Sequence, residues 1–489
     1  MPKNATSIAE SARPSVRNSF GAVLASRRLQ LLVLAAAAAF LYLFKLGTGA
    51  LLDWDEATYA EVAREMTTSG NWLTTTWQHH PFFEKPPLTF WIQSTFFHFF
   101  GASAFWARFP SALAGIALVL LTYLIARRLA SPSAGVFAAF ALMTMNHFDR
   151  VAREGMTDTL LCLCIYLAIY AWMHLCSEQP VWFYLLCTAV GLGAMIKGPA
   201  VLTALLAVSA DWLIERNPEK LLAPRHYLFG SFVVLVIVAP WHLWMIARYG
   251  RAFIDSYLGM QLAERITRVL QDSGGGPGYY FQIILLGSSP WSLVAPVAAA
   301  YRLWKKQSAH ALMWCLIGVV LIGYTLVPTK HQWYILPVYP AIAVEVGALL
   351  AEAGARRRIV RYATVAVLAA GMTMAVVKLV QRQGDLFTNQ VAELAAMAGH
   401  SPYSAPLVVI PDTGGDPQMD LPTAVFYSNR ESILLTVPAD DKKLSELLGS
   451  SKSLDALIQK GALSEVSRLY AVRLKAENGT AAYAEIAAQ

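Results

Sequence analysis

The sequence predicts a polytopic α-helical membrane protein with about 11–13 spans and a small α/β extramembrane domain at its C-terminal end. Of the 489 residues, 56% are hydrophobic and only 15% are charged, whereas a typical soluble domain has about 25% charged residues. Several runs of roughly 17–22 residues carry almost no charge, which is long enough to cross a hydrocarbon layer of about 30 Å. This pattern argues against a soluble enzyme, a disordered protein and a nucleic-acid binder.

The basic charge and the cysteines agree with a membrane protein. Basic cytoplasmic loops produce the same excess as the net charge of +7 and the pI near 9.0 seen here. All five cysteines lie inside apolar runs and are interpreted as small core hydrophobes. Cys162 and Cys164 are two positions apart, a spacing that fits neither a zinc knuckle nor a redox pair.

The first apolar run, Leu29–Leu46, sets the orientation of the chain. The basic residues before it place the N-terminus in the cytoplasm. A cleaved signal peptide is the alternative interpretation, but the length of the run and of its basic leader favours a retained helix. With the first run, ten further runs give about eleven spans. These runs are Trp106–Ala126, Gly135–His147, Thr159–Leu175, Val181–Ile196, Ala200–Ile214, Tyr227–Ile246, Tyr279–Ala300, Ala311–Val327, Tyr334–Leu350 and Val360–Val380.

The basic clusters between the runs all fall on the cytoplasmic side under this count. Counting Pro86–Gly101 as a span would break that agreement, so this segment is predicted to be an amphipathic helix on the outer membrane surface. The predicted organisation is a cytoplasmic N-terminus, a membrane domain with three outer loops, and an outer α/β domain. Their bounds are 1–28, 29–380 with loops 47–105, 149–158 and 249–278, and 381–489.

The C-terminal domain is predicted from short apolar runs between turn residues. Leu407–Ile410 and Ser432–Val437 are rich in β-branched and aliphatic residues and are predicted to be strands. Ala439–Leu448 and Leu454–Lys460 are predicted to be helices.

The first outer loop is dense in ionisable residues. Its segment Asp55–Met66 has helical spacing and ends near Gly70. Asp55 stands where a helix N-cap would stand, so a capping role is the alternative to a functional one. For Lys85 the alternative is a contact with lipid headgroups.

A second acidic residue, Asp158, lies at the outward mouth of the next helix. A carboxylate beside an apolar run is costly to bury unless it is paired, so Asp158 is a functional candidate, with a helix cap as the alternative. Several cations lie on the same side of the membrane. Carboxylates and cations at one membrane face fit an anionic lipid substrate, because cations hold phosphate and a carboxylate accepts a proton. These cations are Lys197, Arg265, Arg268 and Lys330, next to His331.

Several motifs resemble the dolichyl-phosphate-mannose protein mannosyltransferase superfamily. They are Asp55-Glu56, Glu65-Met66, Gly70-Asn71-Trp72 and Phe83–Leu88, and they look most like the bacterial branch that contains 4-amino-4-deoxy-L-arabinose lipid A transferase. The resemblance covers roughly residues 29–350. It continues through Arg108-Phe109-Pro110, Asp158, Lys197-Gly198-Pro199, Pro277–Tyr280, Pro290-Trp291 and Lys330–Pro340.

This resemblance implies a membrane glycosyltransferase fold of type C and an inverting sugar transfer. The donor is a sugar, 4-amino-4-deoxy-L-arabinose or a related one, on polyprenyl phosphate such as undecaprenyl phosphate. The acceptor is lipid A or another envelope molecule at the periplasmic face of the bacterial inner membrane, a modification tied to polymyxin resistance. A protein O-mannosyltransferase-like acceptor remains an alternative.

The resemblance also implies roles for individual residues. Polyprenyl phosphate leaves with its charge stabilised by cations, while a carboxylate deprotonates the acceptor or stabilises the sugar. Phe82 stands where the aminoarabinose enzymes usually have tyrosine, and no histidine matches the family's metal site near Gln261–Arg265. No cofactor is certain; a divalent metal is left open, with Glu84 its only candidate ligand. The implied catalytic residues are Asp55, Asp158 and Glu56, the donor-phosphate cations are Lys85, Arg268, Arg265 and Lys330, and the substrate-pocket residues are Tyr59, Phe82, Glu84 and Tyr334.

Two interpretations from other classes compete with an enzyme. A transporter places its charges near the bilayer midplane at broken helices, whereas the charges here lie in outer loops and the spans carry almost none. A non-catalytic assembly or lipid-binding protein would have no requirement for Asp55.

Overall fold

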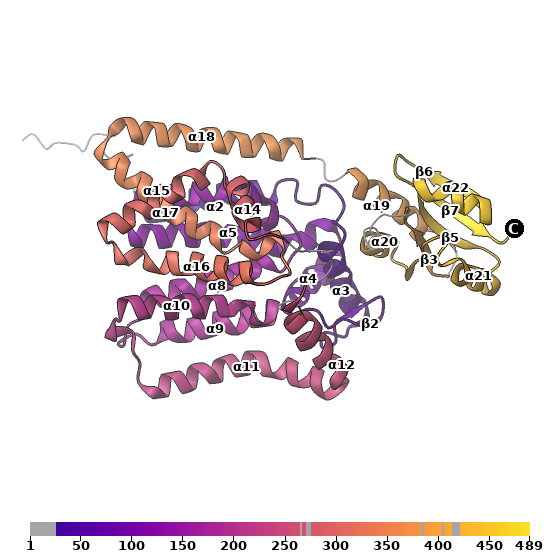
Figure 1. Cartoon of the computed structure of the whole chain (residues 1–489), viewed down its shortest axis with the longest axis horizontal. Coiled ribbons are helices and arrows are strands. Elements are labelled where there is room, and N and C mark those ends of the chain that lie inside the picture. Colours follow the sequence, from indigo (N-terminus) through magenta and orange to yellow (C-terminus); the bar gives the residue numbers. More distant parts are fainter. Residues whose placement is uncertain (1–25, 265–266, 270–274, 383–385, 403–404, 413–420) are drawn as a thin grey trace, which may run out of the picture.

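The computed structural model of the chain describes residues 26–264, 267–269, 275–382, 386–402, 405–412 and 421–489. Figure 1 shows a body of roughly parallel helices with a small α/β domain at one end. The helices of the body are α2 (Arg27–Leu43), α3 (Asp55–Ser69), α4 (Leu88–Phe100), α5 (Ala104–Leu129), α6 (Pro132–Met143), α7 (Asn146–Ala152), α8 (Asp158–His174), α9 (Val181–Lys197), α10 (Leu202–Glu215), α11 (Pro224–Tyr249), α12 (Arg251–Ile254), η3 (Asp255–Glu264), α14 (Tyr279–Gly287), α15 (Trp291–Lys305), α16 (Ala311–Leu326), α17 (Val338–Arg356) and α18 (Arg358–Gln381).

The body is a multi-pass membrane domain, as predicted. Among the described residues, six helices are long and apolar enough to cross a membrane, or seven if the bent pair α14–α15 is one span. The predicted count of about 11–13 also included shorter helices, namely α2, α6 and α8, which have 17, 12 and 17 residues. It also separated α9 from α10, which a 3₁₀ turn of four residues joins into one helical stretch. The exact number of spans stays a prediction.

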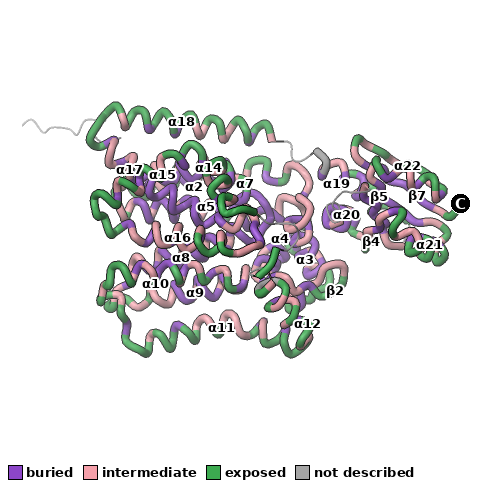
Figure 2. The backbone as a smooth tube through the Cα atoms, in the orientation of Figure 1, coloured by how far each residue is buried: buried purple, intermediate pink, exposed green. Residues whose placement is uncertain are grey.

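Inner and outer helices differ sharply in burial. Within the most apolar 18-residue stretch of each helix, 83% of the residues are buried in the helix that contains α17, but only 17% are buried in α11 and in α18. Figure 2 shows exposed surface along most of α11 and α18. Leu228 and Phe232 on α11 and Val365 and Met374 on α18 are exposed apolar side chains. Such surfaces are stable in contact with lipid hydrocarbon, whereas in water they would cause association.

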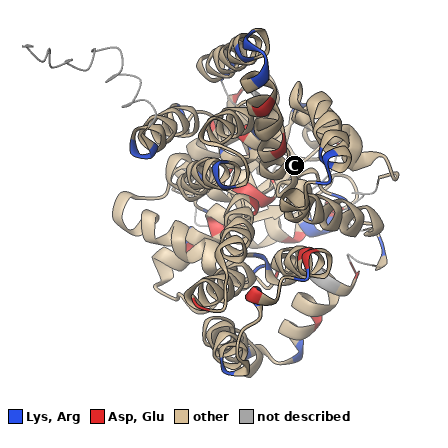
Figure 3. Ribbon diagram, turned by 90° about the vertical axis from the view of Figure 1, so that its left-hand side faces the viewer, with Lys and Arg blue, Asp and Glu red and all other residues tan. Residues whose placement is uncertain are grey.

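Basic residues gather at the end of the body that lies opposite the α/β domain. Figure 3 looks onto that end and shows Lys and Arg at the ends of its helices. The basic residues in the last turns are Arg127 and Arg128 of α5, Arg302 and Lys305 of α15, and Arg356 of α17. These are the clusters that the positive-inside rule assigns to the cytoplasm.

The first outer loop folds as predicted, except at the cap of its helix. α3 ends before Gly70, which takes the left-handed conformation (φ +70°) that glycine adopts readily. Trp54, and not Asp55, is the N-cap of α3, and Asp55 is the first helical residue. Asp158 is likewise the first residue of α8. The capping interpretation of these two carboxylates is therefore wrong, and both side chains remain available for other contacts.

The loop then leads to the predicted surface helix. A two-residue antiparallel pair, β1 (Thr76–Trp77) and β2 (His80–Pro81), follows α3. Pro86 and Pro87 precede α4, whose last residues Phe99 and Phe100 are exposed. A helix is thus present within Pro86–Gly101, and its place on the membrane surface stays a prediction.

The predicted span Tyr279–Ala300 is not one straight helix. It is divided into α14 and α15, which meet at an angle of 108°. Pro290 lies at the break, where its missing N–H and its ring prevent a continuous helix. The long apolar run concealed this bend because hydropathy does not register a local interruption.

The C-terminal domain is a five-stranded sheet with flanking helices. The strand order is β4-β3-β5-β7-β6, with β4, β3 and β5 parallel and β7 and β6 antiparallel to their neighbours. The prediction of a helix at Leu454–Lys460 is wrong, because this segment is the central strand β5, whose first five residues are buried. A short apolar run cannot be assigned by period alone. The elements are α19 (Leu386–Gly399), β3 (Leu407–Ile410), α20 (Leu421–Ser428), β4 (Ser432–Leu434), α21 (Asp441–Ser450), β5 (Leu454–Gln459), α22 (Lys460–Leu469), β6 (Ala471–Glu477) and β7 (Ala481–Ala487).

Candidate functional site

A cavity of about 380 Å³ lies between the outer loops and the C-terminal domain, and we call it the polar cavity. Carboxylates and lysines line one part of it, and aromatic and aliphatic side chains line the rest. Its lining residues are Trp54, Asp55, Thr58, Tyr59, Trp77, Phe82, Glu84, Lys85, Lys197, His331, Trp333, Tyr334, Leu421, Pro422 and Leu434.

A second cavity of about 340 Å³, the apolar groove, adjoins the first. Its lining includes Leu202, Leu206 and Leu258, which are exposed on the surface of the body. The groove is therefore open to the lipid side of the fold. Both cavities share four lining residues, Glu84, Lys85, Lys197 and Tyr334.

The start of α3 positions Asp55 and Tyr59 in the polar cavity. Ala57, Ala60 and Ala63 are fully buried and allow the helix to pack closely. Residues four positions apart share a helix face, so Asp55 and Tyr59 line the cavity together. Neighbouring residues point about 100° apart, because a turn has 3.6 residues. Asp55 and its neighbour therefore face different surroundings.

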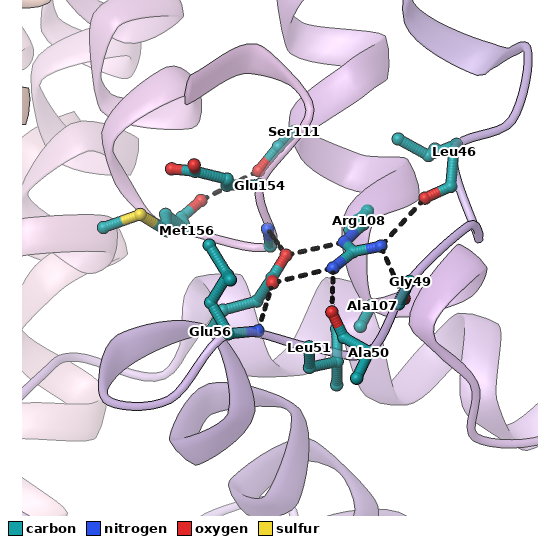
Figure 4. A network of polar contacts seen from close by, with 12 residues as sticks. Leu46, Gly49, Ala50, Leu51, Glu56, Ala107, Arg108, Ser111, Glu154 and Met156 are labelled. Atoms are coloured by element: carbon teal, nitrogen blue, oxygen red, sulfur yellow. Dashed lines mark hydrogen bonds and ion pairs between the residues drawn. The ribbon is translucent and has the colours of Figure 1, made fainter. Parts of the chain in front are cut away.

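Glu56, the neighbour, is held in a closed network that Figure 4 shows. Arg108 donates from Nε to Oε1 at 2.8 Å and from Nη2 to Oε2 at 3.0 Å. The backbone N–H groups of Leu52 and Gly155 donate to the same carboxylate at 2.8 and 2.7 Å. Although burial acts to raise it, the charge and hydrogen bonds of Arg108 hold the pKa of Glu56 below its usual value.

The remaining donors of Arg108 bind the loop before α3. Its Nη1 donates to the carbonyls of Leu46 and Gly49 at 3.1 and 3.2 Å, and its Nη2 donates to that of Ala50 at 2.7 Å. Glu56 is 2% exposed and does not line either cavity. Its predicted catalytic role therefore has no support from geometry, which favours a structural tie between α3, α5 and the 149–158 segment.

Asp158 lines neither cavity, but it contacts Lys197, which lines both. Lys197 Nζ donates to Asp158 Oδ1 at 2.7 Å, and both residues are largely buried. The charges of Asp55 and Lys85 also act on the Asp158 carboxylate. Lys197 Nζ lies 5.0 Å from the centre of the Tyr334 ring. Three carboxylates, those of Asp55, Glu84 and Asp158, and the two lysines thus form one charge cluster where the cavities meet.

The segment before α4 presents Glu84 and Lys85 to both cavities. Lys85 is buried, whereas Glu84 is part exposed, and their charged atoms are 3.9 Å apart. Pro86 and Pro87 follow directly and restrict the backbone at this position. Phe82, also predicted as a pocket residue, lines the polar cavity and brings no hydroxyl to it.

Among the described residues, the other predicted phosphate-binding cations do not line the cavities. Arg265 lies outside the described residues. Arg268 has 62% of its side chain exposed and pairs with Glu264 at 2.6 Å. Lys330 donates to the carbonyls of Thr325 and Val327 at 3.0 and 2.6 Å, where a cation stabilises the C-terminal end of α16.

The question of a metal, which the sequence left open, concerns Glu84 as its one candidate ligand. In the part of the chain that the structure describes, no three His, Cys, Asp or Glu side chains come together in a way that could hold a metal ion. Glu84, the candidate ligand, has its carboxylate 3.9 Å from the ammonium group of Lys85.

Sequence reasoning missed two parts of this site. It noted Lys197 as an outward cation but did not include it among the site residues, although the Lys-Gly-Pro sequence at the end of a helix was a usable signal. It also missed the contribution of the C-terminal domain, because Leu421, Pro422 and Leu434 belong to no recognisable motif.

The comparisons first define a class of protein. Residues 84–244 match the family described as dolichyl-phosphate-mannose-protein mannosyltransferase. In the solved structures, ArnT from Cupriavidus metallidurans bound to undecaprenyl phosphate has a TM-score of 0.78 at 18% identity, covering 94% of this chain and 98% of that one. An Archaeoglobus fulgidus oligosaccharyltransferase has a TM-score of 0.54 at 10% identity, covering 88% and 69%. These likenesses establish the fold, that of polytopic type C membrane glycosyltransferases.

The similar sequences then point to one branch of that class. The chain is 28% identical over 319 residues to the undecaprenyl phosphate-alpha-4-amino-4-deoxy-L-arabinose arabinosyl transferase of Erwinia tasmaniensis, covering 63% of this chain and 56% of the relative. It is 27% identical over 307 residues to an uncharacterized protein of Aquifex aeolicus, covering 62% and 60%. The matches thus span 56–60% of these relatives' lengths. The resemblance inferred from the motifs is confirmed.

Proposed function

We propose that the chain is an inverting glycosyltransferase that moves a sugar from polyprenyl phosphate to lipid A or another envelope acceptor. The reaction takes place at the periplasmic face of the bacterial inner membrane. The observation that carries the proposal is the junction of an apolar groove with a charged cavity at Lys85 and Lys197. A lipid-linked phosphate needs this arrangement, with hydrocarbon on one side of the cations and reactive groups on the other.

The carrier lipid fits the apolar groove. Leu202, Leu206 and Leu258 contact the prenyl chain, which enters from the lipid side of the fold. The carrier phosphate lies against Lys85 and Lys197, because charge-assisted hydrogen bonds from ammonium groups hold phosphate strongly. The names of the relative from Erwinia tasmaniensis and of the Cupriavidus metallidurans structure, which holds undecaprenyl phosphate, support this carrier and a 4-amino-4-deoxy-L-arabinose donor.

The transfer is a single displacement at the anomeric carbon. The bond from this carbon to the phosphate oxygen breaks, and the phosphate keeps the electron pair. The acceptor oxygen forms the new bond from the opposite side, so the anomeric centre is inverted. Lys85 and Lys197 stabilise the charge of the leaving phosphate where it develops. Asp158 holds Lys197 in place through their 2.7 Å contact.

Asp55 acts on the other side of the sugar. Against a hydroxyl acceptor it takes the proton as general base. Against a lipid A phosphate, which is already ionised near neutral pH, it stabilises the positive charge that develops on the sugar. Glu56 takes no part in the chemical steps, since its carboxylate is occupied by Arg108 and two backbone N–H groups.

Mass spectrometry of envelope lipids tests this function. Lipid A is compared among cells with no copy of the gene, the wild type, Asp55→Asn, Lys85→Ala and the control Asp255→Asn, which changes an exposed carboxylate of an outer segment. The expected result is a sugar-sized added mass in the wild type and the control alone. Identical lipid A in all five would overturn the lipid A assignment. In that case, a sugar found on glycoproteins would favour the protein O-mannosyltransferase-like acceptor.

A further inference from the structure

The C-terminal domain supplies part of the wall of the polar cavity. Leu421 and Pro422, at the start of α20, and Leu434, at the end of β4, line the same cavity as Asp55 and Tyr59. These three residues come from a domain that follows the membrane body in sequence. The candidate reaction centre is therefore assembled from both parts of the molecule.

The first connection fixes α20 to the start of α3. The Thr423 N–H donates to Asp53 Oδ1 at 2.9 Å, and the buried Thr423 hydroxyl donates to the Leu51 carbonyl at 3.3 Å. Arg64 Nη1 donates to the Phe426 carbonyl at 2.8 Å. Because Asp53 lies two residues before Asp55, this connection sets the distance between the wall and the carboxylate.

A second connection fixes β4. The Ser432 N–H donates to Gln78 Oε1 at 2.8 Å, next to Trp77, which lines the polar cavity. Ser432 and Leu434 are two positions apart and therefore lie on the same face of the strand. Hydrogen bonds with the membrane body thus hold both α20 and β4, and they fix the position of the wall in the cavity.

The wall belongs to one cavity only. Among the described residues, those lining the apolar groove lie between Glu84 and Tyr334, whereas the polar cavity also reaches Leu421, Pro422 and Leu434. The carrier lipid and its phosphate occupy the groove side of Lys85 in the proposed function. The wall of the C-terminal domain thus lies on the side of the cations where the sugar and the acceptor meet.

We propose that Leu421, Pro422 and Leu434 form the acceptor-contacting wall and determine which acceptor the site takes. The wall and the neighbouring Trp77 and Trp333 offer apolar contact opposite the charge cluster. This surface fits an acceptor that presents an apolar face beside its reacting oxygen, such as a sugar ring of a glycolipid. The inference rests on the proposed function and adds the part of the site that selects the acceptor.

Steady-state kinetics of the full chain in detergent test the wall. The donor is undecaprenyl phosphate carrying aminoarabinose, the acceptor is lipid A, and each is varied in turn. Leu421→Ala and Leu434→Ala are expected to raise the acceptor KM about tenfold, since apolar contacts of this size discriminate by about that factor. The donor KM and the binding of undecaprenyl phosphate stay at the wild-type level. Leu421→Met keeps about the same side-chain volume, so its acceptor KM is expected to lie within about threefold of the wild-type value.

The control is Leu474→Ala, which truncates an exposed leucine of β6 in the same domain, away from the cavity. It is expected to change neither KM. An unchanged acceptor KM in both wall variants overturns the inference while leaving the proposed function intact. Equal rises of donor and acceptor KM, also in Leu474→Ala, overturn it as well, because the domain would then act only through overall stability. A wild type that neither transfers sugar nor binds undecaprenyl phosphate instead overturns the proposed function.

Discussion

Asp55 and Glu56 are adjacent in sequence and lie in opposite environments. Asp55 borders the polar cavity, whereas Glu56 is buried and accepts four hydrogen bonds from Arg108, Leu52 and Gly155. The helix turns about 100° between them, which separates the two carboxylates into two regions. A carboxylate with all its acceptor sites occupied serves structure, while one at a cavity beside lysines is available for chemistry.

The comparison teaches how one motif serves two purposes. Glu56 joins α3 to α5 and to the 149–158 segment through Arg108 and Gly155, which fixes the helix that carries Asp55. A mutation in either residue is expected to lower activity in a cell, but for different reasons. Variants of these residues and of their partners separate a loss of stability from a loss of chemistry.

Arg108→Ala is expected to have the largest effect on stability. It leaves the Glu56 carboxylate buried without its cation, and breaking a buried ion pair costs about 3–5 kcal/mol. The unfolding free energy in detergent is measured by denaturant titration. Arg150→Ala is the control, because Arg150 is part exposed and pairs with Glu154 at 3.5 Å, an interaction worth about 1 kcal/mol or less. If Arg108→Ala keeps the wild-type stability but transfers no sugar, the Arg108–Glu56 pair has a catalytic role and the account is contradicted.

Lys85→Ala is expected to weaken carrier binding about 100-fold. The reason is the loss of a charge-assisted hydrogen bond to phosphate, worth about 1.5–3 kcal/mol. Binding of undecaprenyl phosphate to the purified protein is measured directly. Lys330→Ala, which removes a cation bound to the carbonyls of Thr325 and Val327, should bind the carrier as the wild type does. If Lys330→Ala weakens carrier binding and Lys85→Ala does not, the phosphate binds at Lys330 and outside the two cavities.

Glu154, a buried carboxylate next to Gly155 of the Glu56 network, is expected to make the unfolding free energy depend on pH. Burial raises its pKa to about 7 from 4.5, because the charged form is poorly solvated there. The folded state therefore holds a proton that the unfolded state has lost between about pH 4.5 and 7, so this group makes stability fall as pH rises through that range. The shift from 4.5 to about 7 is about 2.5 pKa units. At about 1.4 kcal/mol per pKa unit, Glu154→Gln should gain about 3 kcal/mol relative to the wild type at pH 8 but little at pH 4.5. Equal differences at both pH values, measured by thermal unfolding, would contradict the assignment.

Thr423→Val tests the connection between the two domains and should have the smallest effect. The hydroxyl loses its bond to the Leu51 carbonyl, and one such bond contributes about 1 kcal/mol. Hydrogen exchange of the α20 amides should become faster, while exchange in α5 stays unchanged. Thr373→Val is the matched control, since its hydroxyl bonds a carbonyl of its own helix. Equal exchange of α20 in Thr423→Val and the wild type would show that this contact does not hold the domain.

The sequence was sufficient for much of the membrane body. Charge-free runs predicted its helices because an apolar helix in lipid needs no other signal. Hydropathy could not predict the bend between α14 and α15, which depends on local breaks near Pro290. It also could not assign Leu454–Gln459, where a buried strand and a buried helix have the same composition.

The site was predictable where motifs carry it. Asp55, Tyr59, Glu84 and Lys85 were predicted together and line one cavity. Glu56 could not be separated from Asp55 by sequence, since the partner that occupies it, Arg108, lies 52 positions away. The acceptor wall was missed because packing between distant segments leaves no local pattern.

The most direct measurement compares Asp55→Asn with Glu56→Gln in one assay. The rate of sugar transfer per folded molecule and the thermal midpoint are determined for both purified variants. The account predicts that Asp55→Asn loses about 100-fold or more in rate with a midpoint close to the wild type, as expected for a general base or charge-stabilising group. Glu56→Gln should lose stability while each folded molecule keeps a rate within about tenfold of the wild type. A fully active Asp55→Asn, or a stable and inactive Glu56→Gln, would contradict the account.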